Sequence, residues 1–129
     1  MPFIDFSENK AIHLKNEHDL QTQVVEYLRS TDLTFAANLN GFLDTAEKRI
    51  RGWQEGMSAG HPDLLIYTPN DTYNGMAIEF KNVNGQGILA KKQADWLQKL
   101  EGDCKYFCIC SNDYTVILEC IIKYLLNVL

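Results

Sequence analysis

The sequence GHPDLLIY at residues 60–67 and the sequence MAIEFK at residues 76–81 decide the fold of this chain. Each contains a short apolar run, and proline, asparagine, aspartate and glycine are frequent between them, so we expect two strands joined by a turn. Strand side chains alternate between faces, which puts Glu79 and Lys81 on the same face of the second strand. Asp63 opens the first strand. The sequence therefore predicts that two carboxylates and an amine converge at one edge of a sheet.

Such a cluster needs a cation, because two ionised carboxylates close together repel and raise each other's pKa. Oxygen ligands suit Mg²⁺ or Mn²⁺. A metal of this kind lowers the pKa of bound water and stabilises charge on a phosphoryl oxygen, while Lys81 can orient the water or neutralise the transition state. The pattern predicts phosphodiester hydrolysis. The alternative is that Glu79 and Lys81 form a surface strand pair and that Asp63 is a turn residue.

Three motifs in order carry a family resemblance. They are GHPDL at residues 60–64, IEFK at residues 78–81 and KKQ at residues 91–93. In this order they resemble the PD-(D/E)XK nuclease superfamily, and within it the VRR-NUC (virus-type replication and repair nuclease) family. The similarity runs from residue 17 to the C-terminal helix. His61 departs from the pattern, because a small or branched apolar residue is expected there.

The resemblance implies an α/β fold with a restriction-endonuclease-like core, in which a mixed central sheet of about four strands is flanked by helices on both faces. It also implies a Mg²⁺-dependent endonuclease, with Mn²⁺ as a substitute, that acts on branched DNA in replication, repair or recombination. Resolution of four-way (Holliday) junctions is the best specific expectation for so small a domain.

By the same resemblance, the catalytic residues are Glu17, Asp63, Glu79, Lys81 and Gln93. The expected metal ligands are Asp63, Glu79, the backbone carbonyl of Phe80, and Glu17 directly or through water.

Residues 17–29 predict a helix, because apolar side chains recur at helical spacing at Leu20, Val24 and Leu28. Glu17 lies within that apolar arc and Glu26 on the opposite side, so we expect Glu17 to face the core. A carboxylate there is costly unless it is paired or bound to metal, which favours Glu17 as the helix glutamate of the site. The alternative is an acid placed in the first turn by the helix dipole.

Residues 88–101 predict a second helix, whose apolar face is interrupted by a single polar side chain, Gln93. A buried amide needs hydrogen-bond partners, and the nearby sheet edge would supply them. The alternative is that Gln93 only ties the helix to a backbone carbonyl.

The net charge of −5 argues against a protein that coats DNA by bulk electrostatics, so local clusters matter more. The candidate DNA-binding residues are Lys48, Arg49, Arg51, Lys91 and Lys92. Trp53 beside the first three suits base stacking, although a lone tryptophan is more often part of a core. The alternative for each cluster is a solvated face.

The 129 residues, 46% apolar and 22% charged, predict one globular domain over residues 1–129. The start MPFIDF is unlike a signal peptide, and no run reaches the roughly 18 apolar residues that span a bilayer. We expect an intracellular protein, neither secreted nor membrane-bound, in the cytoplasm of a bacterium or, if viral, in the host cell. The cysteines are expected to be reduced, buried thiols. Cys108 and Cys110 should face the same side of a strand.

The other patterns predict strands at residues 35–39 and 105–110, a polar connection at 40–56 and a closing helix at 114–129. Residues 1–14 show no sustained period and predict only a leading arm. The loop expected at residues 82–87 carries two glycines.

The closing helix predicts a homodimer. From residue 116 onward its only polar side chains are spaced four apart, at Glu119, Lys123 and Asn127, so most of its circumference is apolar. Such a helix must be buried on more than one side, and a partner subunit could cover part of it. A two-fold dimer would also match the symmetry of a four-way junction. The alternative is a core helix covered by the N-terminal arm.

Two further functions stay open. One is a noncatalytic DNA-binding or assembly subunit that keeps the fold, which the intact set of Asp63, Glu79 and Lys81 disfavours. The other is a flap or nicking endonuclease, which the sequence does not separate from a junction resolvase.

Overall fold

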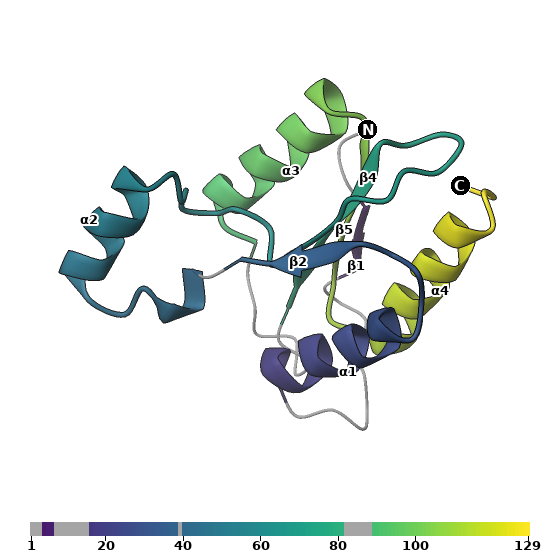
Figure 1. Ribbon diagram of the computed structural model, residues 1–129, viewed down its shortest axis with the longest axis horizontal. Helices are drawn as coiled ribbons and strands as arrows, with labels where there is room; N and C mark the ends of the chain where they lie inside the picture. The colour runs from purple at the N-terminus through teal and green to yellow at the C-terminus, as the bar shows by residue number, and fades with distance from the viewer. Residues whose placement is uncertain (1–3, 7–15, 39, 82–88) are drawn as a thin grey trace.

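The chain folds around a mixed β-sheet (Figure 1). The computed structural model describes residues 4–6, 16–38, 40–81 and 89–129. Within them the sheet has five strands in the order β1-β5-β4-β3-β2. The strands are β1 (Ile4–Phe6), β2 (Phe35–Ala37), β3 (Leu64–Ile66), β4 (Gly75–Phe80) and β5 (Tyr106–Ser111). β2, β3 and β4 pair antiparallel, whereas β4, β5 and β1 pair parallel. The expected mixed α/β sheet is confirmed, with one strand more than the sequence predicted.

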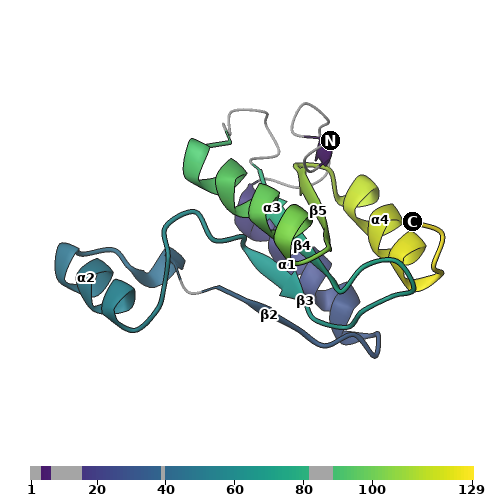
Figure 2. The same cartoon turned by 90° about the horizontal axis from the view of Figure 1, so that it is seen from above.

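Helices cover both faces of this sheet, as expected (Figure 2). The helices are α1 (Glu17–Arg29), α2 (Ala46–Gln54), α3 (Lys91–Asp103) and α4 (Tyr114–Leu125), and a 3₁₀ turn, η1, spans Asn40–Phe42. α1 and α4 pack together on one face, and α3 packs on the other against β5. α2 stands away from the sheet in both views.

Alternation along the central strands sorts the side chains into two cores. Ile78 and Phe80 of β4 are buried with α1 and α4, whereas Ala77 is buried with α3. Glu79 follows the same alternation and lies on the α3 side. Cys108 and Cys110 share the α3 side as predicted. The face that carries Glu79 is therefore closed by α3, which brings residues of that helix to the carboxylate.

α1 has the predicted bounds, and its first turn explains why. The side chain of Asn16 accepts a hydrogen bond from the Asp19 backbone N–H at 2.9 Å, which caps the helix. Leu20, Val24 and Leu28 are buried as their spacing predicted. The other helices differ by a few residues, since α3 begins at Lys91 and α4 ends at Leu125. The loop expected at residues 82–87 lies outside the described residues.

The polar connection predicted at residues 40–56 is wrong, because this segment contains η1 and α2. The Thr45 side chain accepts from the Lys48 backbone N–H at 3.1 Å and caps α2. Gly52 is the buried residue of the helix. A Cβ there would lie 3.2 Å from both Leu43 and Met57, so the glycine lets the chain on either side of α2 pack closely.

Part of the expected leading arm is a strand. In β1, Ile4 pairs with Ile109 and Phe6 with Ser111 of β5. Three residues are too few to show a period, and the pairing that makes them a strand is far away in the sequence. The rest of the arm, residues 1–3 and 7–14, lies outside the described part of the chain.

All four cysteines are free thiols, as predicted. Cys108, Cys110 and Cys120 are buried, but Cys104 is exposed, so the expectation of burial is wrong for that residue. Burial raises the pKa of the Cys108 thiol to about 12, which keeps it protonated and unreactive. Among the described residues, no helix combines the length and apolar character needed to cross a membrane.

Candidate active site

Asp63 and Glu79 meet at the end of β4, as the sequence predicted. Because Leu64 of β3 pairs with Ile78 of β4 in antiparallel register, the residue before Leu64 lies opposite the residue after Ile78. Asp63 Oδ2 accepts the Phe80 backbone N–H at 2.9 Å, and the Asp63 backbone N–H donates to Glu79 Oε2 at 3.2 Å. These bonds hold both carboxylates at the same edge of the sheet.

Gln93, in the first turn of α3, joins the residues of this cluster. Its Nε2 donates to Glu79 Oε1 at 2.6 Å. Its Oε1 accepts from Lys81 Nζ at 3.1 Å and from the Ala90 backbone N–H at 2.9 Å. The amide therefore finds the partners that its place on an apolar face required, and the alternative of a tie to a backbone carbonyl is wrong. One side chain fixes the start of α3, the carboxylate and the lysine together.

Lys81 lies just beyond the last residue of β4 and is 4% exposed. Its backbone N–H donates to the Ser111 carbonyl at 3.0 Å, which continues the pairing with β5. The ammonium lowers the pKa of both Asp63 and Glu79, but it does not offset the effect of their burial. The expected convergence of two carboxylates and an amine is what the structure contains.

Burial raises the pKa of both carboxyl groups in this cluster. Burial first, and then the negative charge of Asp63, raise the pKa of Glu79 to about 9. Burial also raises the pKa of Asp63, although the hydrogen bond from the Phe80 N–H works against the shift. Without a further cation, Glu79 therefore holds a proton at neutral pH. A divalent cation between the two groups would replace that proton, because it stabilises the ionised carboxylates.

The donor atoms fit a hard divalent ion. In the part of the chain that the structure describes, no three histidine, cysteine, aspartate or glutamate residues form a cluster able to hold a metal. Mg²⁺ does not require one, because it keeps several waters and is often bound through one or two carboxylates. Asp63 and Glu79 match that requirement, and the Phe80 carbonyl follows Glu79 directly in the chain.

Glu17 is placed differently from the prediction. Its side chain is exposed, so the expectation that it faces the core is wrong. Glu17 is the first residue of α1, and the buried residues of that helix begin only at Leu20. Its carboxyl group still lies near the cluster, because partial burial and then the charge of Asp63 raise its pKa while Lys81 lowers it. Glu17 is thus at the rim of the site.

The candidate DNA-binding residues lie on two helices. Lys48, Arg49 and Arg51 are on α2, and Lys91 and Lys92 begin α3. Three of the five form exposed ion pairs one helical turn apart: Lys48 with Asp44, Arg51 with Glu55 and Lys91 with Asp95. Such pairs are worth only about 0–1 kcal/mol, so they exchange readily for a phosphate. Arg49 and Lys92 have no ion pair within the described residues.

Trp53 is 74% exposed on α2, so the alternative that it belongs to a core is wrong. Within the described residues, neither the five cationic side chains nor this ring forms a hydrogen bond with Asp63 or Glu79. They lie on segments that lead into the candidate site, since α2 precedes Asp63 and Lys91 precedes Gln93 in the chain.

Two residues near Asp63, Asn38 and His61, support the site without being predicted to do so. Asn38 Nδ2 donates to the carbonyls of His61 and Pro62, at 2.9 and 2.6 Å, and the Asn38 backbone N–H donates to the Asp63 carbonyl at 3.0 Å. No motif identifies Asn38, because its role depends on the distant pairing of β2 with β3. His61, the departure from the family pattern, packs edge-on against Trp96 of α3 with ring centroids 5.1 Å apart.

The backbone conformation and the close packing at residue 60 require a glycine. The φ of Gly60, +84°, favours glycine, and a Cβ there would lie 2.6 Å from the Lys92 carbonyl carbon. The motif glycine therefore lets the chain leading to Asp63 lie directly against the first turn of α3.

Two comparisons agree with this geometry. The VRR-NUC domain model matches residues 7–111. A solved structure described as a VRR_NUC domain protein is similar with a TM-score of 0.68 and 19% sequence identity, over 84% of this chain and 86% of that chain. At that identity the likeness shows the fold alone. No curated protein sequence matches the chain.

Proposed function

Because the chain belongs to the VRR-NUC domain family, whose members have a nuclease domain of the PD-(D/E)XK type, we propose that it is a Mg²⁺-dependent endodeoxyribonuclease that cuts branched DNA. The preferred substrate in this proposal is the four-way junction. The observation that carries it is the hydrogen-bonded set of Asp63, Glu79, Lys81 and Gln93 at one edge of the sheet. Because its substrate is DNA, we place the protein inside the cell, in replication, repair or recombination.

Asp63, Glu79 and the Phe80 carbonyl would hold Mg²⁺, or Mn²⁺ in its place, with Glu17 contributing directly or through water. When bound, such an ion lowers the pKa of water and stabilises charge on a phosphoryl oxygen. The raised pKa of Glu79 supports this assignment, because a cation would replace the proton that the buried carboxyl otherwise keeps.

Lys81 and Gln93 are proposed to act on the reacting groups. The Lys81 ammonium can orient a nucleophilic water or stabilise the negative charge that develops on the phosphate. Its hydrogen bond to Gln93 Oε1 fixes where that charge sits. Gln93 in turn restricts the Glu79 carboxylate through its Nε2. In this proposal Gln93 is a positioning residue for both groups.

The cationic side chains of α2 and of the first turn of α3 are proposed to bind the DNA backbone. Arg49 and Lys92 are the strongest candidates, since neither forms an ion pair within the described residues. Phosphate contacts of this kind give affinity that falls with salt concentration, so binding should weaken as salt rises.

A homodimer through α4 is the proposed assembly. Ile117, Cys120, Ile121 and Tyr124 bury one side of the helix against the sheet. The other side and the following turn leave apolar side chains exposed, with Ile122 at 38%, Leu125 at 41%, Leu126 at 66% and Val128 at 64%. A partner subunit that covers them would relate two catalytic sites by a two-fold axis, as the two cut strands of a four-way junction are related.

The test is cleavage of four-way, flap and linear duplex DNA by the purified protein with Mg²⁺ and with EDTA. We expect paired, symmetric cuts across the four-way junction that need the metal. Cleavage of flaps alone would move the assignment to a flap endonuclease. Binding without any cleavage would favour a noncatalytic subunit.

The dimer is tested by light scattering at micromolar concentration on the wild type and on Ile122→Glu and Leu126→Glu. We expect the wild type to be a dimer and the variants to be monomers. A wild-type monomer that still makes paired junction cuts would overturn the dimer proposal.

A further inference from the structure

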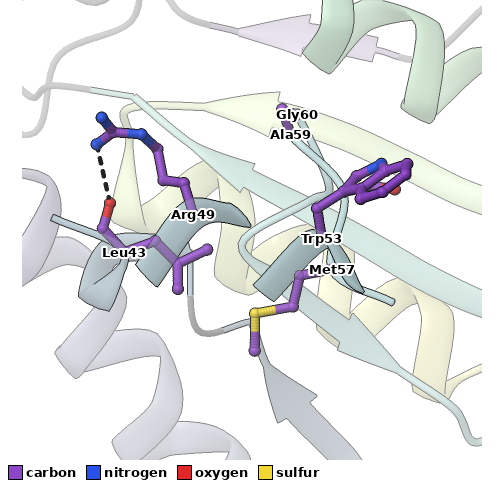
Figure 3. A pocket seen from close by; sticks show the side chains of 7 residues that line it. Leu43, Arg49, Trp53, Met57, Ala59 and Gly60 are labelled. Carbon is purple, nitrogen blue, oxygen red and sulfur yellow. Dashed lines mark hydrogen bonds between the residues drawn. The ribbon is translucent and has the colours of Figure 1, made fainter. Parts of the chain in front are cut away.

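A pocket of about 340 Å³ lies between α2 and the chain that leads back to the catalytic cluster (Figure 3). We call it the α2 pocket, and its lining includes Leu43, Arg49, Trp53, Met57, Ala59 and Gly60. In the figure, Arg49 extends from α2 toward the Leu43 carbonyl and Trp53 extends in another direction, and Ala59 and Gly60 lie between them in the view. Its volume is in the range of about 300–1,000 Å³ that is typical of small-molecule sites. It is therefore large enough for one planar heterocycle.

Trp53 gives this pocket a stacking surface. The side chain is 74% exposed, although tryptophan is highly buried on average. The apolar groups of Leu43 and Met57 line the same hollow. An exposed indole beside apolar side chains suits a flat aromatic ligand, and nucleobases stack on such rings whatever their sequence.

Arg49 gives the pocket a positive charge. One guanidinium nitrogen donates to the Leu43 carbonyl at 3.4 Å, and within the described residues the group has no acidic partner. Its neighbours on α2 differ, because Lys48 and Arg51 pair with acids. Arginine presents its remaining N–H groups as a planar fork that suits phosphate oxygens. The lining of the pocket therefore offers one group suited to a base and one suited to a phosphate.

The α2 pocket also lies close to the catalytic cluster. Gly60 of its lining precedes Asp63 by three residues, so their Cα atoms are at most about 11 Å apart. A second pocket of about 270 Å³ shares Met57 and Ser58 with the first and reaches His61 and Trp96. A nucleotide at the Gly60 end of the α2 pocket would thus lie beside a phosphate bound at Asp63.

We infer that the α2 pocket binds the base of an unpaired nucleotide next to the cut position, with the base stacked on Trp53 and its phosphate against Arg49. The inference rests on the proposed nuclease function and narrows its substrate. A base inside a duplex cannot enter a side pocket unless it leaves the stack, which has an energetic cost. Branched DNA that already offers unpaired nucleotides should therefore fill the pocket at the lowest cost, whereas a four-way junction would have to unpair one nucleotide at its branch point.

The test measures binding of a splayed-arm DNA duplex in an Asp63→Ala background, so that cleavage does not interfere. Trp53→Ala should weaken binding by roughly 5- to 100-fold, the range expected for losing one base–aromatic stack. Trp53→Phe, which keeps an aromatic face, should retain most of the affinity. Ile50→Ala is the matched control, because Ile50 is 60% exposed on the same helix and lies outside the pocket lining. It should bind as tightly as the parent.

The DNA provides the second arm of the experiment. Abasic nucleotides are placed in turn at each position near the cut. At the position whose base fills the pocket, removal of the base should weaken binding by the parent, and Trp53→Ala should then cause no further loss. Equal losses for Trp53→Ala on intact and abasic DNA at every position, or no loss at all, would overturn the inference.

The two proposals fail in different ways. If the wild type cleaves branched DNA while Trp53→Ala binds normally, the base pocket is refuted and the nuclease stands. If the wild type cleaves no DNA but binding still depends on Trp53 and on one base, the pocket stands and the nuclease is refuted. If no DNA is bound, both are refuted.

Discussion

The amide of Gln93 donates to the carboxylate of Glu79 at 2.6 Å, across the gap between α3 and β4. The two residues are 14 apart in the chain, and between them lies a segment outside the described residues. This bond makes the position of a candidate metal ligand depend on where α3 begins. A substitution in the first turn of α3 should therefore change the position of the Glu79 carboxylate.

Replacing Gln93 should reduce cleavage without unfolding the protein. Gln93→Ala removes three hydrogen bonds, two of them to charged groups, and such bonds are worth about 1.5–3 kcal/mol each. We expect kcat on branched DNA to fall by about 10- to 100-fold. Gln98→Ala on the exposed side of the same helix is the matched control and should keep full activity. Equal activity in the two variants would refute the role of Gln93.

Asp63→Ala and Glu79→Ala should each abolish cleavage while DNA binding stays the same or becomes tighter. Each change removes an expected metal ligand and also a negative charge that repels the phosphate. Cleavage with Mg²⁺ and binding without it are measured on the same DNA. Asp103→Ala, an exposed acid at the end of α3, controls for charge alone. Full activity in either site variant, or wild-type activity that survives EDTA, would contradict the metal assignment.

Lys81→Met should lose the chemical step and keep the metal. Methionine retains much of the apolar stem in a side chain that is 4% exposed, so the fold should be preserved. Calorimetric titration should show Mg²⁺ affinity close to that of the wild type, while single-turnover cleavage falls by at least about tenfold. A variant whose only defect is weaker metal binding would show that Lys81 shapes the metal site instead.

Glu17→Gln should impair cleavage far more than Glu26→Gln. Both residues lie on α1 and both are exposed, but Glu17 lies near the cluster, where partial burial and then the charge of Asp63 raise its pKa. The comparison therefore separates proximity to the cluster from general surface charge. Rates at saturating Mg²⁺ and at low Mg²⁺ would show whether Glu17 acts through the ion. If Glu26→Gln were the more damaging change, the assignment of Glu17 would be wrong.

The metal-free protein should lose stability as pH rises from about 5 to 9. Glu79 has a folded-state pKa of about 9 against an ordinary value of 4.5, so the folded state keeps a proton that the unfolded state releases in that interval. The stabilisation is fully present below pH 4.5 and is lost as pH rises through 9. Thermal unfolding in EDTA should show Tm falling across this range.

Glu79→Gln isolates this contribution. The variant cannot ionise at this position, so its Tm in EDTA should depend less on pH than that of the wild type, and it should exceed the wild-type value at pH 8. Saturating Mg²⁺ should flatten the wild-type profile as well, because the ion replaces the proton. A wild-type Tm in EDTA that rises steadily from pH 5 to 9 would contradict the raised pKa of Glu79.

The sequence predicted the centre of this molecule better than its edges. Strand alternation and helix periodicity are local rules, and each site residue lies in or beside a strand or helix with a clear apolar pattern. These rules were therefore enough to place four residues together: Asp63, Glu79, Lys81 and Gln93. α1 was placed correctly because Asn16 caps it and three buried residues repeat along one face.

The errors occur where structure depends on distant partners or on little burial. β1 is a three-residue edge strand that exists only through its pairing with β5. α2 buries Gly52 alone, so no apolar period marks it, and the cap at Thr45 is its main sequence signal. The phase of α1 predicted that Glu17 faces the core, which is wrong, because periodicity does not say where the apolar arc of a helix meets the sheet.

Asn38 joins the two ends of the segment that carries α2. Its side chain and backbone bind the carbonyls of His61, Pro62 and Asp63, so the chain leaves the sheet after β2 and returns to it at nearly the same point. A segment closed at its base in this way can be exchanged as a unit, because changes in its length add little loop-closure entropy and leave the strand pairing intact. Residues 40–60 are therefore the natural place for this protein to have diversified. Different inserts there could change the surface beside the candidate site while Asp63 and Glu79 keep their places.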